Sequence, residues 1–196
     1  LSSDKGPFPR FPGTDDFRIG PRPVRCWASA GLQPVPYGVQ AVEDNPVTGE
    51  KIELGKLVLE VVSGCGDREP VPRAVVNDDQ VWISGDRERL RMALSHAIRN
   101  AQEATPQDGL VEVRLGHECG KARIEIADSG AGMDAEFVRE RLFKPFDSTK
   151  GTQGVGIGAY QVQETVRLAG GTVSVESQPG RGTTMVWRLP RVGEKV

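Results

Sequence analysis

Residues 121–134 read KARIEIADSGAGMD, an alternating strand followed at once by a polar turn. Ala122, Ile124 and Ile126 lie on one face of this strand, because successive side chains of a strand point to opposite sides. Asp128 has the same parity, so its carboxylate is directed toward the core, where it is costly unless hydrogen-bonded. The segment therefore predicts a half-buried strand with a polar site at its end.

The turn after this strand leaves space beside the carboxylate. Gly130 and Gly132 allow the backbone next to Asp128 to turn sharply and to come close to a ligand. An acceptor that faces such a space suits a flat hydrogen-bond donor, such as an amino-bearing heterocycle. The alternative is that Asp128 only caps the following turn through an Asx-type hydrogen bond.

The surrounding sequence predicts an α+β fold, with one layer of helices on one mixed sheet. Two hairpins are predicted from alternating segments, and the long helix has an N-cap at Asp86 and a stop at Pro106. The expected strands are 81–84, 110–116, 121–128, 171–177 and 183–190, and the expected helices are 52–62, 87–105, 134–142 and about 158–169.

Composition limits the class of protein. At 196 residues, with 37% hydrophobic and 27% charged content, the chain is long enough for one domain with a sizeable core. A net charge of -2 gives no basic footprint for nucleic acid. The scattered cysteines have no CxxC spacing, which argues against a disulfide framework or zinc site and fits a reducing compartment.

The sequence contains no apolar run of membrane-spanning length and no signal peptide. Residues 1–50 hold most of the fourteen prolines and predict a Pro/Gly-rich linker or poorly ordered segment. The ordered domain is expected over residues 51–191, and residues 192–196 are a tail. Because the chain starts at Leu1 rather than Met, we expect a fragment, with any targeting or membrane segment upstream.

Two further segments carry polar or glycine residues that are unusual for their place in a helix. On the long helix, His96, Asn100 and Glu103 line the edge of the core stripe, which suits either a pocket wall or an ordinary solvated flank. In DSTKGTQGVGIGAYQVQE, residues 147–164, three alternate glycines open a helix. Such a turn suits an anion at the helix N-terminus, although a flexible hinge is the alternative.

Taken in order, five segments resemble the boxes of one family. They are HAIRNAQEA, DSGAGMD, RLFKPFDSTK, GVGIGAY and GRGTT, all within about residues 51–191. Together they resemble the ATP-binding domain of sensor histidine kinases, in the wider gyrase, Hsp90, histidine kinase and MutL group. The wording of residues 142–161 most resembles the kinases of PEP-CTERM/exosortase exopolysaccharide systems.

This resemblance implies a Bergerat-type ATP-binding fold, a two-layer sandwich in which about three helices cover one face of a mostly antiparallel mixed sheet. It implies that Asp128 accepts from the adenine amino group, that Asn100 holds Mg²⁺, and that Thr183 reaches the adenine through hydroxyl or water contacts. Gly130 and Gly132 would let the base approach the backbone.

The resemblance also implies a short ATP lid, STKGTQG, over residues 148–154. The implied phosphate-binding residues are Gly154, Gly156, Gly158 and Lys150, with Lys144 as a further candidate, and the implied lid anchors are Phe143 and Phe146. Because the lid is polar and flanked by glycine, we expect nucleotide to order it.

The chain departs from the family at three positions. Many relatives carry a lysine and an aromatic residue where this chain has Glu103 and Ala104, so the usual phosphate lysine and adenine-flanking ring are missing at these positions. His96 replaces an asparagine, and in ATP-hydrolysing relatives this position holds the glutamate that activates water. His96 is therefore a candidate catalytic residue with Asn100, the alternative being a satisfied histidine in the pocket wall.

Other nucleotide-binding classes fit less well. A Rossmann site needs a strand before its glycines, a P-loop motif is absent, and a gyrase- or MutL-like ATPase needs a transducer domain and a glutamate in the first box. The prediction is a protein histidine kinase domain, cytoplasmic, in a parent anchored at the inner membrane. An anti-sigma-type serine kinase or an inactive ATP-binding module is the alternative.

The sequence offers only His96 and His117 as phosphate acceptors, and neither lies in an H-E-[IL]-[KR]-N-like helix. The expected partners are therefore a histidine on a separate dimerisation helix, through which alone a homodimer would form, and a response regulator. No nucleic acid partner is expected.

Overall fold

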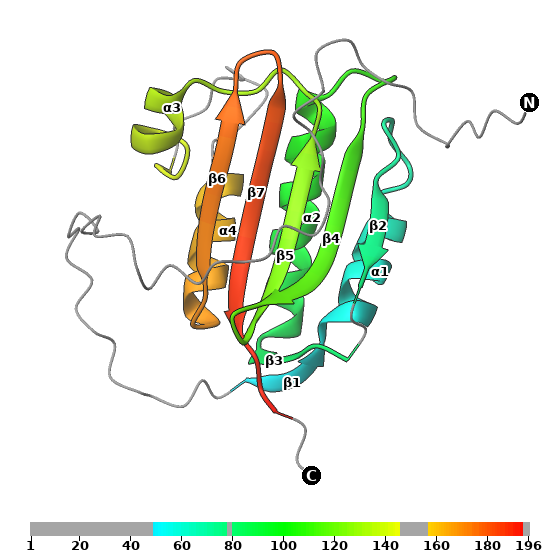
Figure 1. Ribbon diagram of the computed structural model, residues 1–196, viewed down its shortest axis with the longest axis vertical. Helices are drawn as coiled ribbons and strands as arrows, with labels where there is room; N and C mark the ends of the chain where they lie inside the picture. The colour runs from blue at the N-terminus through cyan, green and yellow to red at the C-terminus, as the bar shows by residue number, and fades with distance from the viewer. Residues whose placement is uncertain (1–48, 78–79, 146–156, 194–196) are drawn as a thin grey trace, which may run out of the picture. The chain divides into compact units, whose positions relative to one another are not determined.

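The computed structural model describes residues 49–77, 80–145 and 157–193. Its main sheet has the strand order β2-β4-β5-β7-β6 (Figure 1). These strands are β2 (Arg73–Val76), β4 (Val111–Glu118), β5 (Lys121–Asp128), β6 (Thr172–Gln178) and β7 (Gly182–Pro190). Only the β2–β4 pair is parallel, so the expected mixed and mostly antiparallel sheet is confirmed.

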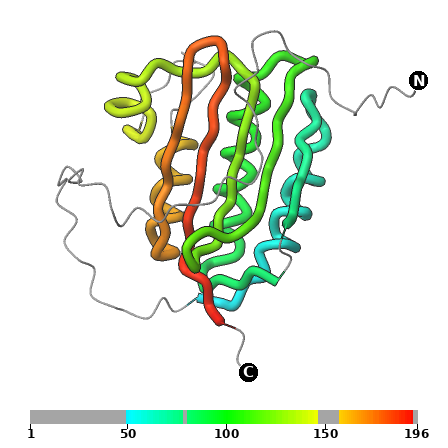
Figure 2. Tube along the Cα trace, in the orientation of Figure 1, coloured from blue at the N-terminus to red at the C-terminus, as the bar shows by residue number. Residues whose placement is uncertain are grey.

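Helices cover one face of this sheet, as expected (Figure 2). They are α1 (Leu54–Gly64), α2 (Arg87–Ala104) and α4 (Gly158–Leu168), whereas the short α3 (Ala135–Glu140) lies beyond the edge strand β6. None of the helices formed by the described residues is long and apolar enough to cross a membrane.

The long helix α2 begins and ends where the sequence predicts. The Asp86 carboxylate caps it by accepting a hydrogen bond of 3.0 Å from the Arg89 N–H. Thr105 is the C-cap, directly before Pro106, which cannot continue a helix without distortion. The caps set the length of α2, and the burial of its apolar face sets its rotation and therefore the positions of its polar side chains.

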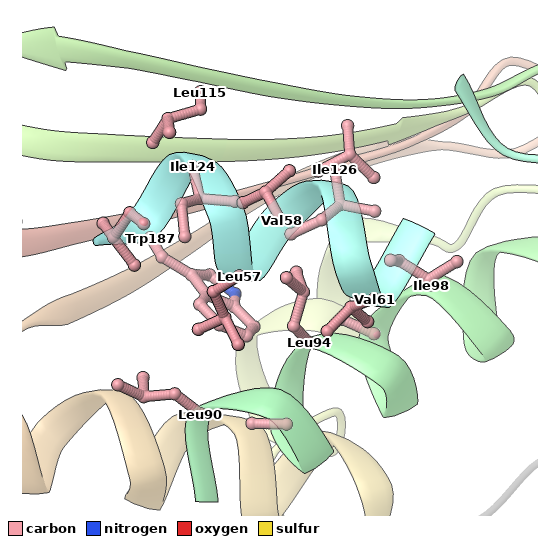
Figure 3. Packing of buried hydrophobic residues seen from close by; sticks show 14 of the residues in the cluster. Leu57, Val58, Val61, Leu90, Leu94, Ile98, Leu115, Ile124, Ile126 and Trp187 are labelled. Atoms are coloured by element: carbon pink, nitrogen blue, oxygen red, sulfur yellow. The ribbon is translucent and has the colours of Figure 1, made fainter. Parts of the chain in front are cut away.

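The core lies between the helices and the sheet (Figure 3). Leu90, Leu94 and Ile98 of α2 are at most 2% exposed, and they pack with α1 against the inward face of the strands. Trp187 of β7 fills the middle of this layer at 1% exposure. Deleting such large buried side chains typically costs several kcal/mol, so this layer supplies much of the stability.

The structure differs from the sequence prediction at the start of the domain. Residues 52–62 were expected to form a helix, but β1 (Glu50–Glu53) pairs antiparallel with β3 (Trp82–Gly85), and α1 begins only at Leu54. Ile52 lies opposite Ile83 and is 3% exposed, so its burial in this pair outweighs its position in the helical pattern.

Two other local predictions need correction. The sequence did not predict β2, because this four-residue strand after Pro72 is too short to show alternation. It forms through its parallel pairing with β4. The first hairpin turn is also tighter than residues 117–120. His117 is the penultimate residue of β4, exposed, and the turn is Cys119 and Gly120, with φ values of 48° and 76°.

Gln102 links α2 to the segment before β2 by side-chain hydrogen bonds. It is 2% exposed, and its Nε2 lies 3.0 Å from the Cys65 carbonyl oxygen, 2.8 Å from that of Arg68 and 3.1 Å from that of Pro70. The bonds to Cys65 and Pro70 are buried, and a buried carbonyl without a donor is costly, so the two protons of this amide satisfy backbone that would otherwise be without a partner.

We predict that Gln102→Leu lowers the free energy of unfolding by about 1–3 kcal/mol, because the leucine fills the space but leaves those carbonyls without a donor. Chemical denaturation of the purified chain would measure the loss. The matched control is Gln107→Leu at an exposed position, which should have almost no effect. Equal effects of the two substitutions would contradict this role of Gln102.

Candidate functional site

Polar side chains replace the apolar layer at one end of the sheet. Asp128 at the end of β5 is the register partner of Thr183 at the start of β7, and Thr183 is the partner of Ser177 in β6. Asp128 follows the parity of the buried Ile126, and all three polar residues are partly buried. The strands β5, β7 and β6 lie side by side (Figure 1), and their ends at Asp128, Thr183 and Ser177 are called the sheet edge below.

Asp128 uses one carboxylate oxygen to hold the backbone around it. Its Oδ1 accepts from the Gly130 N–H at 2.9 Å and from the Thr183 N–H at 3.2 Å. Neither of these bonds uses Oδ2, so a second acceptor remains. The Asx-type cap weighed from the sequence therefore exists, and it is compatible with a ligand on the other oxygen. Burial raises the pKa of Asp128, and the two backbone hydrogen bonds oppose that rise.

The loop after Asp128 is pressed between α2 and the β6–β7 turn. The Ala131 N–H donates to the Ala104 carbonyl oxygen at 2.9 Å, and the Gly180 N–H donates to the Ala131 carbonyl oxygen at 2.7 Å. A Cβ on Gly130 would overlap the Ala104 carbonyl oxygen, so only glycine fits there. The backbone beside the carboxylate is therefore bare and closely held.

Two more glycines are required by contact and by conformation. Gly132 has a φ of 67°, and a Cβ there would overlap the Gln178 carbonyl oxygen. Gly182 has a φ of 93°, and a Cβ there would overlap the Asp128 carbonyl oxygen. Both sit in the left-handed region that favours glycine. Gly182 was quoted in the last glycine box but was not predicted as a site residue.

The polar row of α2, which is His96, Asn100 and Glu103, contacts the first residue of α4 through Asn100. A Cβ on Gly158 would lie 3.4 Å from the Asn100 Nδ2, so the start of α4 comes directly against the Asn100 amide. His96, one turn earlier, is partly buried, and its Nδ1 is buried with no hydrogen-bond partner among the described residues. Glu103 is exposed and pairs with Arg68, with 3.2 Å between Oε1 and Nη1.

Part of the predicted site lies outside the described residues. This holds for Lys150, Gly154, Gly156, Phe146 and the lid segment 148–154. Of the neighbouring candidates, Phe143 is partly buried and Lys144 is exposed. The structure thus brings together Asp128, Gly130, Gly132 and Thr183 at the sheet edge, and Asn100 with Gly158 at the α2–α4 contact.

Sequence reasoning missed Ser177. In β6 the inward parity is Val173, Val175 and Ser177, so the strand carries the same signal that identified Asp128, an apolar face that ends in a polar side chain. The same comparison of parities across all three strands would have found it.

Residues 85–193 match the family model described as "Histidine kinase-, DNA gyrase B-, and HSP90-like ATPase". The chain belongs to this ATPase family. Among curated proteins, it is 31% identical over 159 residues to the sensor histidine kinase ZraS of Escherichia coli K12, covering 81% of this chain and 32% of that protein. The chain spans less than half of the length of these curated relatives, between 11% and 39%.

Solved structures of histidine kinases share the fold. The mycobacterial sensor histidine kinase MprB matches with a TM-score of 0.63 at 25% identity, covering 73% of this chain and 97% of that one. Full-length ShkA, solved in complex with AMPPNP, matches with a TM-score of 0.65 at 23% identity, covering 76% of this chain and 32% of that one. The chain is therefore an ATP-binding domain of the histidine kinase type within its ATPase family.

We predict that Asp128→Asn leaves the nucleotide-free ATPase-family domain at least as stable at neutral pH. The pKa of Asp128 is raised above 3.8 on folding, so its stabilising contribution is present below pH 3.8 and is lost as the pH rises through the folded-state pKa. Asparagine keeps the Oδ1 acceptor without the charge. Denaturation curves of parent and variant between about pH 4 and about pH 7 should diverge as the pH rises.

We also predict that the same substitution weakens ATP binding by about 1–3 kcal/mol. The family resemblance places the adenine amino group at this carboxylate, and an amide would present a donor there where a carboxylate would accept. Calorimetric titration with ATP measures this loss. A variant that is less stable than the parent by a constant amount at every pH, and that binds ATP normally, would contradict both halves of the prediction.

Proposed function

We propose that this chain is the catalytic domain of a sensor histidine kinase. It binds Mg·ATP and donates the γ-phosphoryl group to a histidine on a dimerisation helix that lies outside this sequence. The observation that carries the proposal is the partly buried Asp128 at the end of β5, whose Oδ1 holds the Gly130 and Thr183 N–H groups while neither bond uses its Oδ2. Membership of the ATPase family and the ZraS likeness support it.

In this proposal the adenine ring lies against the Gly130–Gly132 backbone. The Oδ2 of Asp128, which neither of the two backbone hydrogen bonds uses, accepts a hydrogen bond from the 6-amino group, and Thr183 adds a contact directly or through water. The two glycines hold this loop closely against the Ala104 and Gln178 carbonyl oxygens, so its backbone is fixed in place where the ring is proposed to lie.

The phosphate end lies at the α2–α4 contact. Asn100 would hold Mg²⁺ through its side-chain oxygen, and phosphate oxygens and water would supply the other ligands, which suits the preference of Mg²⁺ for oxygen. The described residues contain no cluster of three His, Cys, Asp or Glu side chains able to hold a metal. Gly154, Gly156, Gly158 and Lys150 complete the proposed phosphate contacts.

His96 is the proposed second catalytic residue. Its buried Nδ1 lacks a partner among the described residues, one helical turn before Asn100. A polar atom in that position can hydrogen-bond to a water or a phosphate oxygen once the nucleotide is bound. The alternative, a histidine that only lines the pocket wall, predicts no change in turnover when the side chain is replaced by one of similar shape.

We predict that Asn100→Ala lowers ATP affinity in the presence of Mg²⁺ by about tenfold and leaves the affinity measured with EDTA almost unchanged, because only the metal-bridged contact is lost. Titration of ATP with and without Mg²⁺ gives both values. The matched control is Asn77→Ala, at an exposed asparagine beyond β2. An equal loss with and without Mg²⁺ would count against the metal role.

We further predict that the chain alone binds ATP but does not label itself. Phosphoryl transfer needs a nucleophile in line with the γ-phosphate, and positioning supplies most of the catalysis. His96 lies on a rigid helix, and His117 is in β4. Incubation with γ-labelled ATP should give a labelled protein only when a dimerisation segment carrying an acceptor histidine is added.

The chemistry of the label separates the alternatives. An acid-labile and alkali-stable label on the added segment supports the histidine kinase, whereas an acid-stable label on a serine supports the anti-sigma-type kinase. Binding of ATP without any transfer supports an inactive module. An acid-labile label on the chain itself, lost in His96→Ala, would overturn the assignment of the acceptor to another segment.

The remaining proposals concern the parent protein. The nucleotide-binding domain comprises residues 51–191, with residues 1–50 as a linker and 192–196 as a tail. The phosphorylated histidine passes its phosphoryl group to a response regulator, and the domain works in the cytoplasm in a parent anchored at the inner membrane, as a homodimer formed through the dimerisation segment.

A further inference from the structure

Ser177 stands at the centre of a small hydrogen-bond network at the sheet edge. Its Oγ accepts from the Met133 N–H at 2.8 Å, lies 3.1 Å from the Gly182 carbonyl oxygen, and lies 2.9 Å from the Thr183 Oγ1. It therefore joins β6, the start of β7 and the loop that follows Asp128. The start of β7 and the loop after Asp128 border the proposed adenine site, and Ser177 contacts both of them.

The number of protons fixes the direction of these bonds. A serine hydroxyl has one proton to donate and two lone pairs to accept with. The Met133 N–H can only donate, and the Gly182 carbonyl oxygen can only accept, so the Ser177 proton belongs to the bond with Gly182. The Thr183 hydroxyl must then donate its own proton to Ser177.

Thr183 is consequently left with lone pairs only. Its N–H is bound to the Asp128 Oδ1, and its hydroxyl proton is bound to Ser177. The ligand-facing groups at this edge are then two acceptors, the Thr183 hydroxyl oxygen and the Asp128 carboxylate. Two acceptors suit an exocyclic amino group, which has two protons, and they oppose a carbonyl oxygen at the same place.

We propose that Ser177 is a positioning residue that orients the Thr183 hydroxyl as an acceptor and thereby sets the preference for a 6-amino purine over a 6-oxo purine. This inference rests on the proposed function, since it takes the nucleotide base to lie at the Asp128–Thr183 edge. Ser177 itself need not touch the base, because it acts through Thr183.

The test compares ATP with inosine triphosphate, which differs from ATP in carrying an oxygen in place of the amino group. Calorimetric titration gives the ratio of the two affinities for the parent chain and for each variant. In Ser177→Ala, the Thr183 hydroxyl is free to rotate and donate to the oxygen of inosine, so the preference for ATP should fall by about tenfold. Ser177→Thr keeps the hydroxyl and should restore the preference.

Two further variants separate this role from a general loss of folding. Thr183→Val should lower the ATP preference by itself, and adding Ser177→Ala to it should change the ratio no further, because both act on the same hydroxyl. Ser174→Ala is the matched control on the same strand, where the hydroxyl contacts Arg188 at 2.9 Å, and should leave the ratio unchanged.

Each outcome gives a separate conclusion. If Ser177→Ala weakens ATP and inosine triphosphate in the same proportion, Ser177 is only structural and the proposal is wrong. Additive effects of Ser177→Ala and Thr183→Val on the ratio would also overturn it. If the parent chain binds neither nucleotide, the proposed function itself fails, and that result is visible before any variant is made.

Discussion

The carboxylate of Asp128 on the buried side of β5 is the constraint on which the rest of the site depends. A charge in that position is unfavourable, as its raised pKa indicates, and the fold compensates with two backbone N–H groups on one oxygen. Those donors belong to Gly130 and Thr183, so the compensation fixes both the loop after β5 and the start of β7. The two hydrogen bonds that stabilise the charge therefore also position the loop after β5 and the start of β7.

The same constraint explains where glycine is required. Because the loop must return its N–H to Asp128 while passing the end of α2, its backbone touches the Ala104 carbonyl oxygen, and no side chain fits at Gly130. On the other side, Gly182 lies against the Asp128 carbonyl oxygen. These glycines are consequences of close backbone packing, because a side chain at any of them would overlap a carbonyl oxygen of a neighbouring segment.

The sequence predicted what depends on local pattern. The parity of Asp128, the capped ends of α2 and the two hairpins follow from periods and caps that can be counted along the chain. It did not predict β1 or β2, because each is short and exists only through pairing with a distant strand. The role of Gln102 was not predicted for a related reason, since its three carbonyl partners lie more than thirty residues away in the sequence.

The two ends of the proposed site are built differently, and this bears on how each can work. At the sheet edge, three adjacent strands each supply one polar residue, Ser177, Thr183 and Asp128. Hydrogen bonds link Ser177 to Thr183 and Thr183 to Asp128, so their positions are set before a ligand arrives. At the α2–α4 contact, Asn100 faces Gly158, and the buried His96 Nδ1 has no partner among the described residues. A preformed base site favours recognition, because little order is lost on binding. In the proposed function, the α2–α4 end takes its ligand contacts from groups such as the His96 Nδ1, which the described residues do not engage, so the energy of binding would be directed to the end proposed for phosphoryl transfer.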